Sequence, residues 1–120
     1  MEIIDYKKWS NKATEWGSNY LLNLKNKPVR PNIKPGSVAS LLPNTPPEEA
    51  EDPELIFSDF EKIVPNAMTH WQHPRFFAYF PSNASVASIV AEQLVSTIAA
   101  QCMLWQTSPA ATEIEEVMVQ

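Results

Sequence analysis

Glycine is scarce in this sequence, which has only Gly17 and Gly36 among its 120 residues, against 11 prolines. No phosphate loop of the G-x-G or G-K-[ST] type can be built from two isolated glycines. A nucleotide site of that kind is therefore excluded. The chain is long enough for one small domain and too short for two.

Cysteine and positive charge are also limited. Cys102 is the only cysteine, which excludes an intramolecular disulfide framework. The net charge of -5 and 44% hydrophobic residues are typical of a folded cytoplasmic protein, and the lysines do not cluster with aromatics as they do in nucleic-acid binders. Asp5, Lys7 and Lys8 interrupt any apolar run at the start, so no signal peptide is predicted.

Positive charge is absent from the second part of the chain. Every lysine and arginine lies at or before Arg75, and the charged residues that follow are Glu92, Glu113, Glu115 and Glu116. Such a charge-poor stretch has to be largely buried, and a chain this short cannot readily bury it alone. We therefore expect other protein to cover it.

The first half predicts two helices joined by a stiff connection. An amphipathic helix follows Asp5 as N-cap and carries apolar residues at steps of three and four, namely Tyr6, Trp9, Ala13, Trp16, Tyr20 and Leu24. Residues 25–51 contain six prolines and predict an extended connection that packs on a surface. Asp52, Pro53 and Glu54 begin a second helix that ends at Pro65. Its predicted inner face is Leu55, Ile56, Phe60, Ile63 and Val64.

Two further helices are predicted after the aromatic stretch. Ser82 or Asn83 caps a third helix that runs to about Met103, with Ile89, Val90, Leu94, Ile98 and Ala99 as its apolar residues. Ser108 and Pro109 begin a fourth, which has Ile114, Val117 and Met118 inward and reaches Gln120 without a cap or breaker. We therefore expect the chain to be the front piece of a longer protein.

Residues 69–82, THWQHPRFFAYFPS, hold two histidines and five other aromatic side chains. His70 and His73 have no cysteine and no third ligand at ordinary spacing, so we predict polar neighbours of an aromatic cluster and no metal site. The aromatic block could equally be plain core. The case for a pocket is the Pro81-Ser82 junction, where a hydroxyl and the first free N–H groups of a helix adjoin aromatic walls and favour an anion.

Two other site hypotheses are disfavoured. Cys102, alone in an apolar helix, is more typical of an inert buried side chain than of a nucleophile. A membrane span over residues 84–105 is opposed by Glu92, Gln93 and Gln101, because a charge at a bilayer centre costs about 3 kcal/mol. A buried interface helix explains the same pattern, and no membrane partner is predicted.

The sequence resembles the N-terminal region of the pyridoxal-phosphate-dependent aromatic amino-acid decarboxylases, the group II family that includes DOPA, tyrosine, tryptophan and histidine decarboxylases. The resemblance covers nearly the whole chain. It rests on the run H-W-x-x-P-x-F-F-A-Y-F-P within residues 69–82, on Trp105 and on SPAATEIE at 108–115. A P-x-x-x-P-G turn at residues 31–36, LLP at 41–43 and SDFEKIVPNAMTHW at 58–71 extend it.

The resemblance implies a mainly α segment, with about four helices and a Pro-rich extended connection, of a type I aminotransferase-like α/β enzyme. Residues 1–82 would be an N-terminal helical dimerisation segment, and residues 83–120 the start of the large cofactor-binding domain. Helices of the family pack across a second subunit, so a homodimer is implied.

The implied chemistry is decarboxylation of an aromatic L-amino acid to its amine and CO2, with pyridoxal 5'-phosphate as the electron sink. The cofactor lysine, the acid on the pyridine nitrogen and the group stacked on the ring match nothing in this sequence. No catalytic, cofactor-binding or metal-ligating residue is therefore assigned, and the 120 residues alone should be inactive.

The resemblance places the substrate side in this chain. Trp71, Tyr79, Phe80 and Pro81 would wall the pocket, with Ser82 at a position that contacts substrate. Two further residues, Gln101 and Met103, would reach the site of the other subunit and make its distal end more polar and more pliable.

Three alternatives stay open. The parent enzyme could be an aromatic aldehyde synthase of the same family. The chain could instead be a stand-alone module that binds a full-length decarboxylase, or a plain helical scaffold. The scaffold predicts that Tyr79 and Ser82 are sealed in core.

Overall fold

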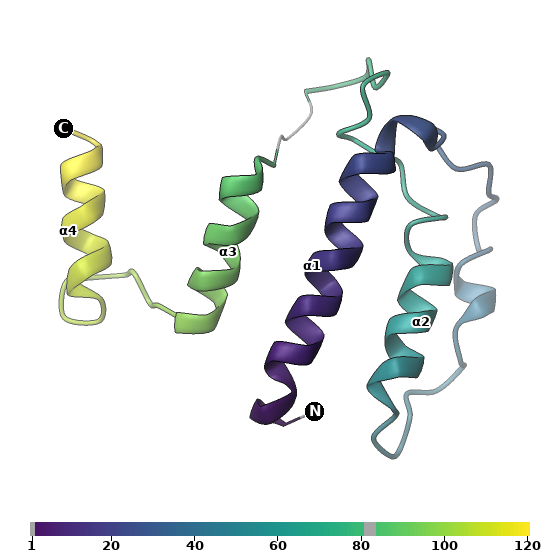
Figure 1. Cartoon of the computed structure of the whole chain (residues 1–120), viewed down its shortest axis with the longest axis horizontal. Helices are drawn as coiled ribbons and strands as arrows, with labels where there is room; N and C mark the ends of the chain where they lie inside the picture. The colour runs from purple at the N-terminus through teal and green to yellow at the C-terminus, as the bar shows by residue number, and fades with distance from the viewer. Residues whose placement is uncertain (1, 81–83) are drawn as a thin grey trace. The chain divides into compact units, whose positions relative to one another are not determined.

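The computed structural model describes residues 2–80 and 84–120, and all regular structure in these ranges is helical (Figure 1). The absence of strands in the described residues agrees with the mainly α segment predicted above. The chain divides into two compact units, Met1–Ser82 and Asn83–Gln120. Each unit has its own helices and is described by itself.

The first unit begins with a single 3-10 turn, Ile3–Asp5, which continues directly into helix α1, Tyr6–Asn23. Asp5 precedes α1 as predicted, but its carboxylate does not bond the amides of α1. It accepts instead from the backbone N–H of Glu2 at 3.0 Å. Asp5 is therefore the N-cap residue of α1, as predicted, but its side chain closes the preceding 3-10 turn and makes no capping bond.

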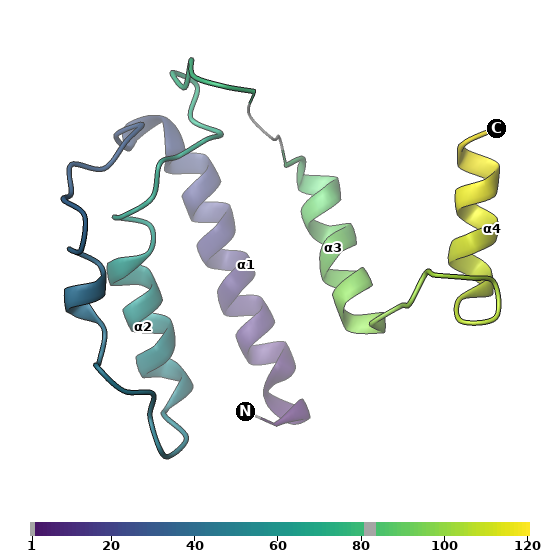
Figure 2. The ribbon, with the colours of Figure 1, turned by 180° about the vertical axis from the view of Figure 1, so that it is seen from behind.

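The proline-rich connection is mostly extended, with 3-10 turns at Leu24–Asn26 and Ala39–Leu41. It runs outside α2, on the side away from α1 (Figure 2). Gly36 sits at a φ of 87°, a backbone conformation that glycine adopts without steric cost. The connection packs only in part, since Leu41 and Leu42 are exposed while Val29 is half-buried.

Helix α2, Pro53–Ile63, begins as the sequence predicted. The Asp52 carboxylate accepts the N–H of Glu54 at 2.9 Å, and Pro53 occupies the first helical position, where no N–H is needed. The predicted inner face is only partly correct. Leu55 and Ile56 are 63% and 54% exposed.

Aromatic contacts decide which face of α2 meets α1. Trp9 of α1 lies 6.3 Å from Phe57, between ring centroids, and Trp16 meets Phe60 edge-on at 4.8 Å. Turning α2 so that these rings meet leaves Leu55 on the opposite side. The seam is thus built from aromatic edges, which prefer tilted and edge-to-face arrangements at such distances.

An ion pair closes one end of the same seam. The Lys8 and Lys12 ammonium groups both pair with the Glu54 carboxylate, Lys8 at 3.2 Å. The hydrogen bonds from Lys12 and then Lys8 hold the pKa of this carboxyl below its usual value. These side chains are largely exposed, so the pairs orient the helices more than they stabilise them.

The second unit contains helix α3, Val86–Ile98, and helix α4, Pro109–Met118. The predicted N-cap of α3 is wrong. Ser82 and Asn83 lie outside the described residues, and Ser85 caps the helix. Its hydroxyl accepts the N–H of Ser88 at 3.0 Å, while the Ser88 hydroxyl accepts the N–H of Ser85 at 3.0 Å.

Helix α3 also ends earlier than the predicted Met103. It stops at Ile98 because Ala99 adopts a left-handed backbone with a φ of 52°, which cannot continue a right-handed helix. Residues 99–108 are therefore a loop. The fourth helix begins at Ser108 and Pro109, as predicted.

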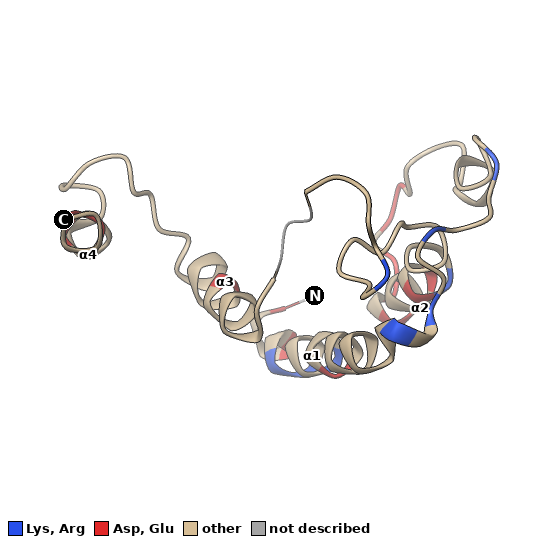
Figure 3. Ribbon diagram, turned by 90° about the horizontal axis from the view of Figure 1, so that it is seen from above, with Lys and Arg blue, Asp and Glu red and all other residues tan. Residues whose placement is uncertain are grey.

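The apolar faces of α3 and α4 are exposed. The exposed fractions include 60% for Leu94, 73% for Ile98 and 70% for Val117. Lysine and arginine are confined to the first unit (Figure 3). The expectation that other protein covers this charge-poor part of the chain stays a prediction. In the described ranges, none of the helices has both the length and the apolar character needed to cross a membrane.

We expect Asp52→Ala to lower the free energy of unfolding by about 1 kcal/mol, because the first N–H groups of α2 lose their acceptor. Urea unfolding followed by circular dichroism measures the change. Asp52→Ser restores a capping oxygen and should recover most of the loss. An equal loss in both variants would contradict the capping role.

Candidate functional site

The aromatic loop, residues 69–80, is attached to the first unit through His70. The His70 side chain is only 4% exposed, and its Nδ1 lies 2.8 Å from the Tyr20 hydroxyl of α1. The backbone N–H of His70 donates to the Val29 carbonyl at 2.9 Å. One buried residue therefore ties the loop both to α1 and to the proline-rich connection.

His73 organises the loop from inside. It is also 4% exposed, and its backbone N–H donates to the His70 carbonyl at 3.0 Å. Its Nδ1 accepts the N–H of Arg75 at 3.0 Å, so the proton of the neutral ring sits on Nε2. That buried Nε2 has no hydrogen-bond partner in the part of the chain that the structure describes.

Both histidines are thus polar supports of an aromatic cluster, which is what the sequence predicted for them. Nδ1 of His70 is hydrogen-bonded to the Tyr20 hydroxyl, and Nδ1 of His73 accepts the backbone N–H of Arg75. Within residues 2–80 and 84–120, no group of three or more His, Cys, Asp or Glu side chains is placed to hold a metal ion.

The predicted pocket residues of this loop lie at its surface. Trp71 is 43% exposed and stacks on Tyr79, with ring centroids 5.7 Å apart and planes 22° from parallel. Phe76 lies on Trp71 as well, at 5.0 Å. Tyr79 and Phe80 are 83% and 98% exposed. The scaffold alternative, with Tyr79 sealed in core, is therefore wrong for this residue. Pro81 and Ser82 lie outside the described residues.

Tyr79 has a strained backbone. Its φ of 56° lies in the left-handed region, which a bulky side chain occupies only at a cost of about 1–3 kcal/mol. Such a conformation persists where neighbouring contacts over-determine it. The ring contact that the structure gives Tyr79 is its stack on Trp71.

A shallow hollow adjoins the base of the loop. It has a volume of about 380 Å³ and is lined by Tyr20, Met68, Thr69, Trp71 and Gln72. Its walls join α1 to the aromatic loop, so the Tyr20–His70 contact forms beside it. The hollow includes one predicted pocket residue, Trp71.

The other predicted pocket residues, Gln101 and Met103, belong to the loop at residues 99–108 in the second unit. Both side chains are exposed, Met103 at 76%. The Thr107 hydroxyl donates to the Gln101 carbonyl at 2.6 Å, and the Trp105 indole N–H donates to Glu113 of α4 at 2.7 Å. Sequence reasoning missed these two supports, because neither the six- nor the eight-residue spacing is a recognised motif.

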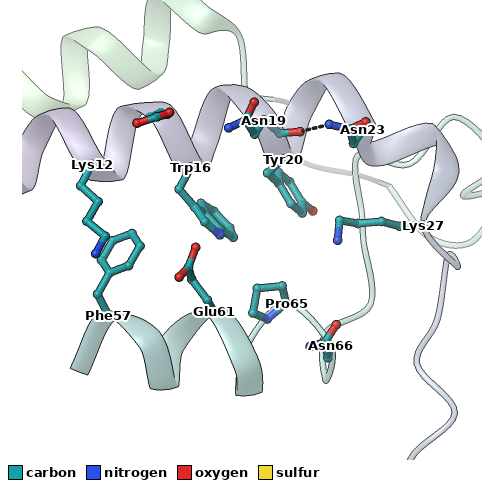
Figure 4. A pocket seen from close by; sticks show the side chains of 11 residues that line it. Lys12, Trp16, Asn19, Tyr20, Asn23, Lys27, Phe57, Glu61, Pro65 and Asn66 are labelled. Carbon is teal, nitrogen blue, oxygen red and sulfur yellow. Dashed lines mark hydrogen bonds between the residues drawn. The ribbon is translucent and has the colours of Figure 1, made fainter. Parts of the chain in front are cut away.

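A second concavity lies between α1 and α2 (Figure 4) and has a volume of about 460 Å³. Trp16 and Tyr20 point into it from α1, and Glu61 from α2. It contains none of the predicted site residues. Its full lining is Lys12, Glu15, Trp16, Asn19, Tyr20, Asn23, Lys27, Phe57, Glu61, Pro65 and Asn66. With both charge signs and no Ser, Thr, Cys or His in its lining, it is a groove between packed helices.

Burial keeps the anchor of the aromatic loop neutral. It lowers the pKa of His70, and electrostatic interactions with Lys27 and His73 lower that pKa further. Burial also raises the pKa of Tyr20. Near neutral pH the contact is therefore a hydrogen bond between an uncharged phenol and an uncharged imidazole.

Comparison with known proteins defines the class. The family described as "Pyridoxal-dependent decarboxylase conserved domain" matches residues 35–120. Over 115 residues the chain is 41% identical to the aromatic-L-amino-acid decarboxylase of Manduca sexta, covering 96% of this chain and 23% of that protein. It is 40% identical over 120 residues to the 4-hydroxyphenylacetaldehyde synthase of Rhodiola rosea, covering 99% of this chain and 24% of the relative.

Solved structures of the same class of enzyme superpose closely on this chain. The crystal structure of the Rhodiola rosea synthase superposes with a TM-score of 0.90 and 36% identity, over 98% of this chain and 25% of that one. The structure of Oryza sativa TDC with PLP and tryptamine gives a TM-score of 0.90 and 35% identity, over 96% and 24%. The chain belongs to the pyridoxal-dependent decarboxylase family. It spans about a quarter of the length of these relatives.

The residues that the structure describes include no lysine suited to bind pyridoxal phosphate. A lysine that binds pyridoxal phosphate has to be uncharged and enclosed when it reacts. Lys12 pairs with Glu54 as a cation, and the Lys27 ammonium lies 6.0 Å from the Tyr20 ring centroid. No lysine of this chain is buried. No step of the reaction is therefore assigned to them.

Stability should fall as the pH is lowered from about 7.5 to about 5.5. The unfolded His70 ring takes up a proton near its ordinary pKa of 6.5, whereas the folded ring, whose pKa is lowered, resists it. The unfolded state then binds more protons and is favoured. Urea midpoints at the two pH values measure the loss. His70→Asn cannot titrate and should give a flatter profile, and equal slopes would contradict the assignment.

Proposed function

We propose that this chain is the N-terminal portion of a pyridoxal-phosphate-dependent decarboxylase that converts an aromatic L-amino acid to its amine and CO2. The observation that carries the proposal is the aromatic loop, whose Tyr79 and Phe80 rings are presented outward by a buried framework. A plain core segment would bury these rings. Outward aromatic rings on a fixed support suit a flat aromatic substrate.

In this proposal the loop is one wall of the substrate pocket. Trp71 and Tyr79 form a stacked pair, and Phe80 extends the apolar surface next to them. Pro81 and Ser82 would continue the wall, with the Ser82 hydroxyl available to bond a polar group of the substrate. When bound, pyridoxal phosphate supplies the electron sink, and residues outside these 120 would hold it.

The exposed apolar faces support a homodimer. Leu94, Ile98 and Val117 are each at least 60% exposed, and large apolar patches of this kind mark protein interfaces. We propose that residues 1–82 act as a dimerisation segment and that residues 83–120 begin the large cofactor-binding domain. Gln101 and Met103 would then enter the pocket of the partner subunit. The single cysteine and acidic composition support a cytoplasmic location.

A second candidate is an aromatic aldehyde synthase. Two relatives carry such names, the 4-hydroxyphenylacetaldehyde synthase of Rhodiola rosea at 40% identity and the 3,4-dihydroxyphenylacetaldehyde synthase of Aedes aegypti at 35%. Product analysis of the complete enzyme with tyrosine, tryptophan and DOPA separates the two. An amine with CO2 supports the decarboxylase, and an aldehyde supports the synthase.

The interaction-module alternative makes a different prediction for the 120 residues alone. A module should behave as a monomer that melts cooperatively, whereas part of a dimeric enzyme should self-associate or lose fixed packing because its apolar helices are uncovered. Gel filtration and near-ultraviolet circular dichroism distinguish these outcomes.

In the complete enzyme, Phe80→Ala should raise the KM for the aromatic substrate about tenfold, since one apolar contact of about 1.4 kcal/mol is lost. Phe77→Ala is the matched control. Phe77 belongs to the same loop and is 92% exposed, but it is not assigned to the wall. Its KM should change less than about twofold. Equal effects of the two substitutions would contradict the assignment of Phe80.

Pyridoxal phosphate added to the 120-residue chain should give no absorbance band of a specific lysine–cofactor adduct, because none of its lysines is buried in an enclosed site. The measurement is an absorbance titration, with borohydride reduction and mass mapping. Stoichiometric labelling of one lysine would show that the cofactor site lies in these residues.

A further inference from the structure

The aromatic loop is connected to helix α1 by a side-chain hydrogen bond between residues 50 positions apart. The Tyr20 hydroxyl lies 2.8 Å from Nδ1 of His70, and the two rings are 5.6 Å apart between centroids. His70 is 4% exposed, so water does not readily replace the phenol as its partner. This pair has no part in the pocket wall proposed above.

We propose that Tyr20 and His70 are positioning residues for the substrate pocket. They hold the aromatic loop against α1 so that Trp71 and Tyr79 keep the orientation in which they receive the substrate. This inference rests on the proposed function for the role of the wall, but the anchoring itself does not depend on it.

Beyond His70, the hydrogen bonds of the loop are local. His73 N–H donates to the His70 carbonyl at 3.0 Å, Arg75 N–H to His73 Nδ1 at 3.0 Å, and Phe76 N–H to the His73 carbonyl at 2.9 Å. For residues 69–80 as described, two hydrogen bonds reach other parts of the unit, one to Val29 and one to Tyr20, and both involve His70. Release of His70 would therefore leave the loop without both of these hydrogen bonds.

The orientation of the wall follows from the same anchor. Trp71 comes directly after His70 in the chain and stacks on Tyr79 at 5.7 Å. Tyr79 has a left-handed φ of 56°, which the loop must hold against its intrinsic preference. A shift of His70 thus displaces Trp71, removes the support of Tyr79 and lets its backbone relax.

Tyr20→Phe tests the anchor by removing one oxygen atom. It leaves a buried imidazole nitrogen without a partner, which favours opening of the loop. The control is Tyr6→Phe, the same change on the same helix about 21 Å away along the axis. Both variants keep the aromatic ring and its packing.

Limited trypsin digestion reports loop opening independently of activity. Between Lys62 and Gln120, Arg75 is the only lysine or arginine, so cleavage between Arg75 and Phe76 is a specific marker of the loop. In the complete enzyme we expect this cleavage to be about tenfold faster in Tyr20→Phe than in the wild type or in Tyr6→Phe. Mass spectrometry of the fragments gives the rate at this bond.

Kinetics and a conservative rescue complete the test. Tyr20→Phe should raise the KM for the amino acid about tenfold and change kcat less than about threefold, because the wall is displaced while the reacting groups remain. His70→Asn keeps a hydrogen-bonding atom in the position of Nδ1, so cleavage at Arg75 should stay as slow in this variant as in the wild type. His70→Leu should behave like Tyr20→Phe.

An unchanged Arg75 cleavage rate in Tyr20→Phe would overturn the proposal. So would a rise that occurs equally after Lys25 and Lys62, since that pattern reports general unfolding. If the complete enzyme releases neither amine nor aldehyde from aromatic amino acids, the proposed function fails, while the Arg75 measurement still decides whether Tyr20 anchors the loop.

Discussion

The aromatic stripe of α1 is the constraint on which the first unit depends. Trp9 and Trp16 meet Phe57 and Phe60, which fixes the face that α2 turns inward. Tyr20 continues the stripe, stacks on Trp16 at 5.3 Å and holds His70 through its hydroxyl. One helix face thus positions both α2 and the aromatic loop. Because Leu24 and Pro65 are the buried apolar residues among those described, these ring contacts take the place of an aliphatic core.

The helices of the second unit bury little of their apolar surface within that unit. Local signals begin both helices, the reciprocal Ser85–Ser88 cap for α3 and Pro109 for α4, but residues such as Leu94 and Val117 stay exposed within the unit. Local signals suffice to form a helix end, whereas burial requires a partner surface. The contrast explains how a segment can have well-defined helices while Leu94 and Val117 remain exposed.

Features set by neighbouring residues in the sequence were largely predictable, whereas the choice of capping residue in α3 and of the inner face of α2 was not. The cap at Asp52, the start at Pro109 and the amphipathic first helix follow from side-chain chemistry within a few residues. The cap of α3 was misplaced because serine or asparagine stands at positions 82, 83 and 85, and only the backbone decides which one bonds the helix. Leu55 was misassigned because a short helix with apolar residues on several sides leaves its inner face to the neighbouring helix.

The sequence by itself determined the family, through the specific run from His70 to Pro81, and the imbalance of charge that sets residues 76–120 apart from the rest of the chain. Tertiary structure alone decided that His70 is a buried anchor bonded to Tyr20, that Trp71 stacks on Tyr79, and that Tyr79 and Phe80 face outward. The physical reason is the distance along the chain over which each interaction acts. Caps, breakers and composition act over a few residues, whereas these contacts join side chains up to 50 positions apart, whose meeting depends on the packing of α1.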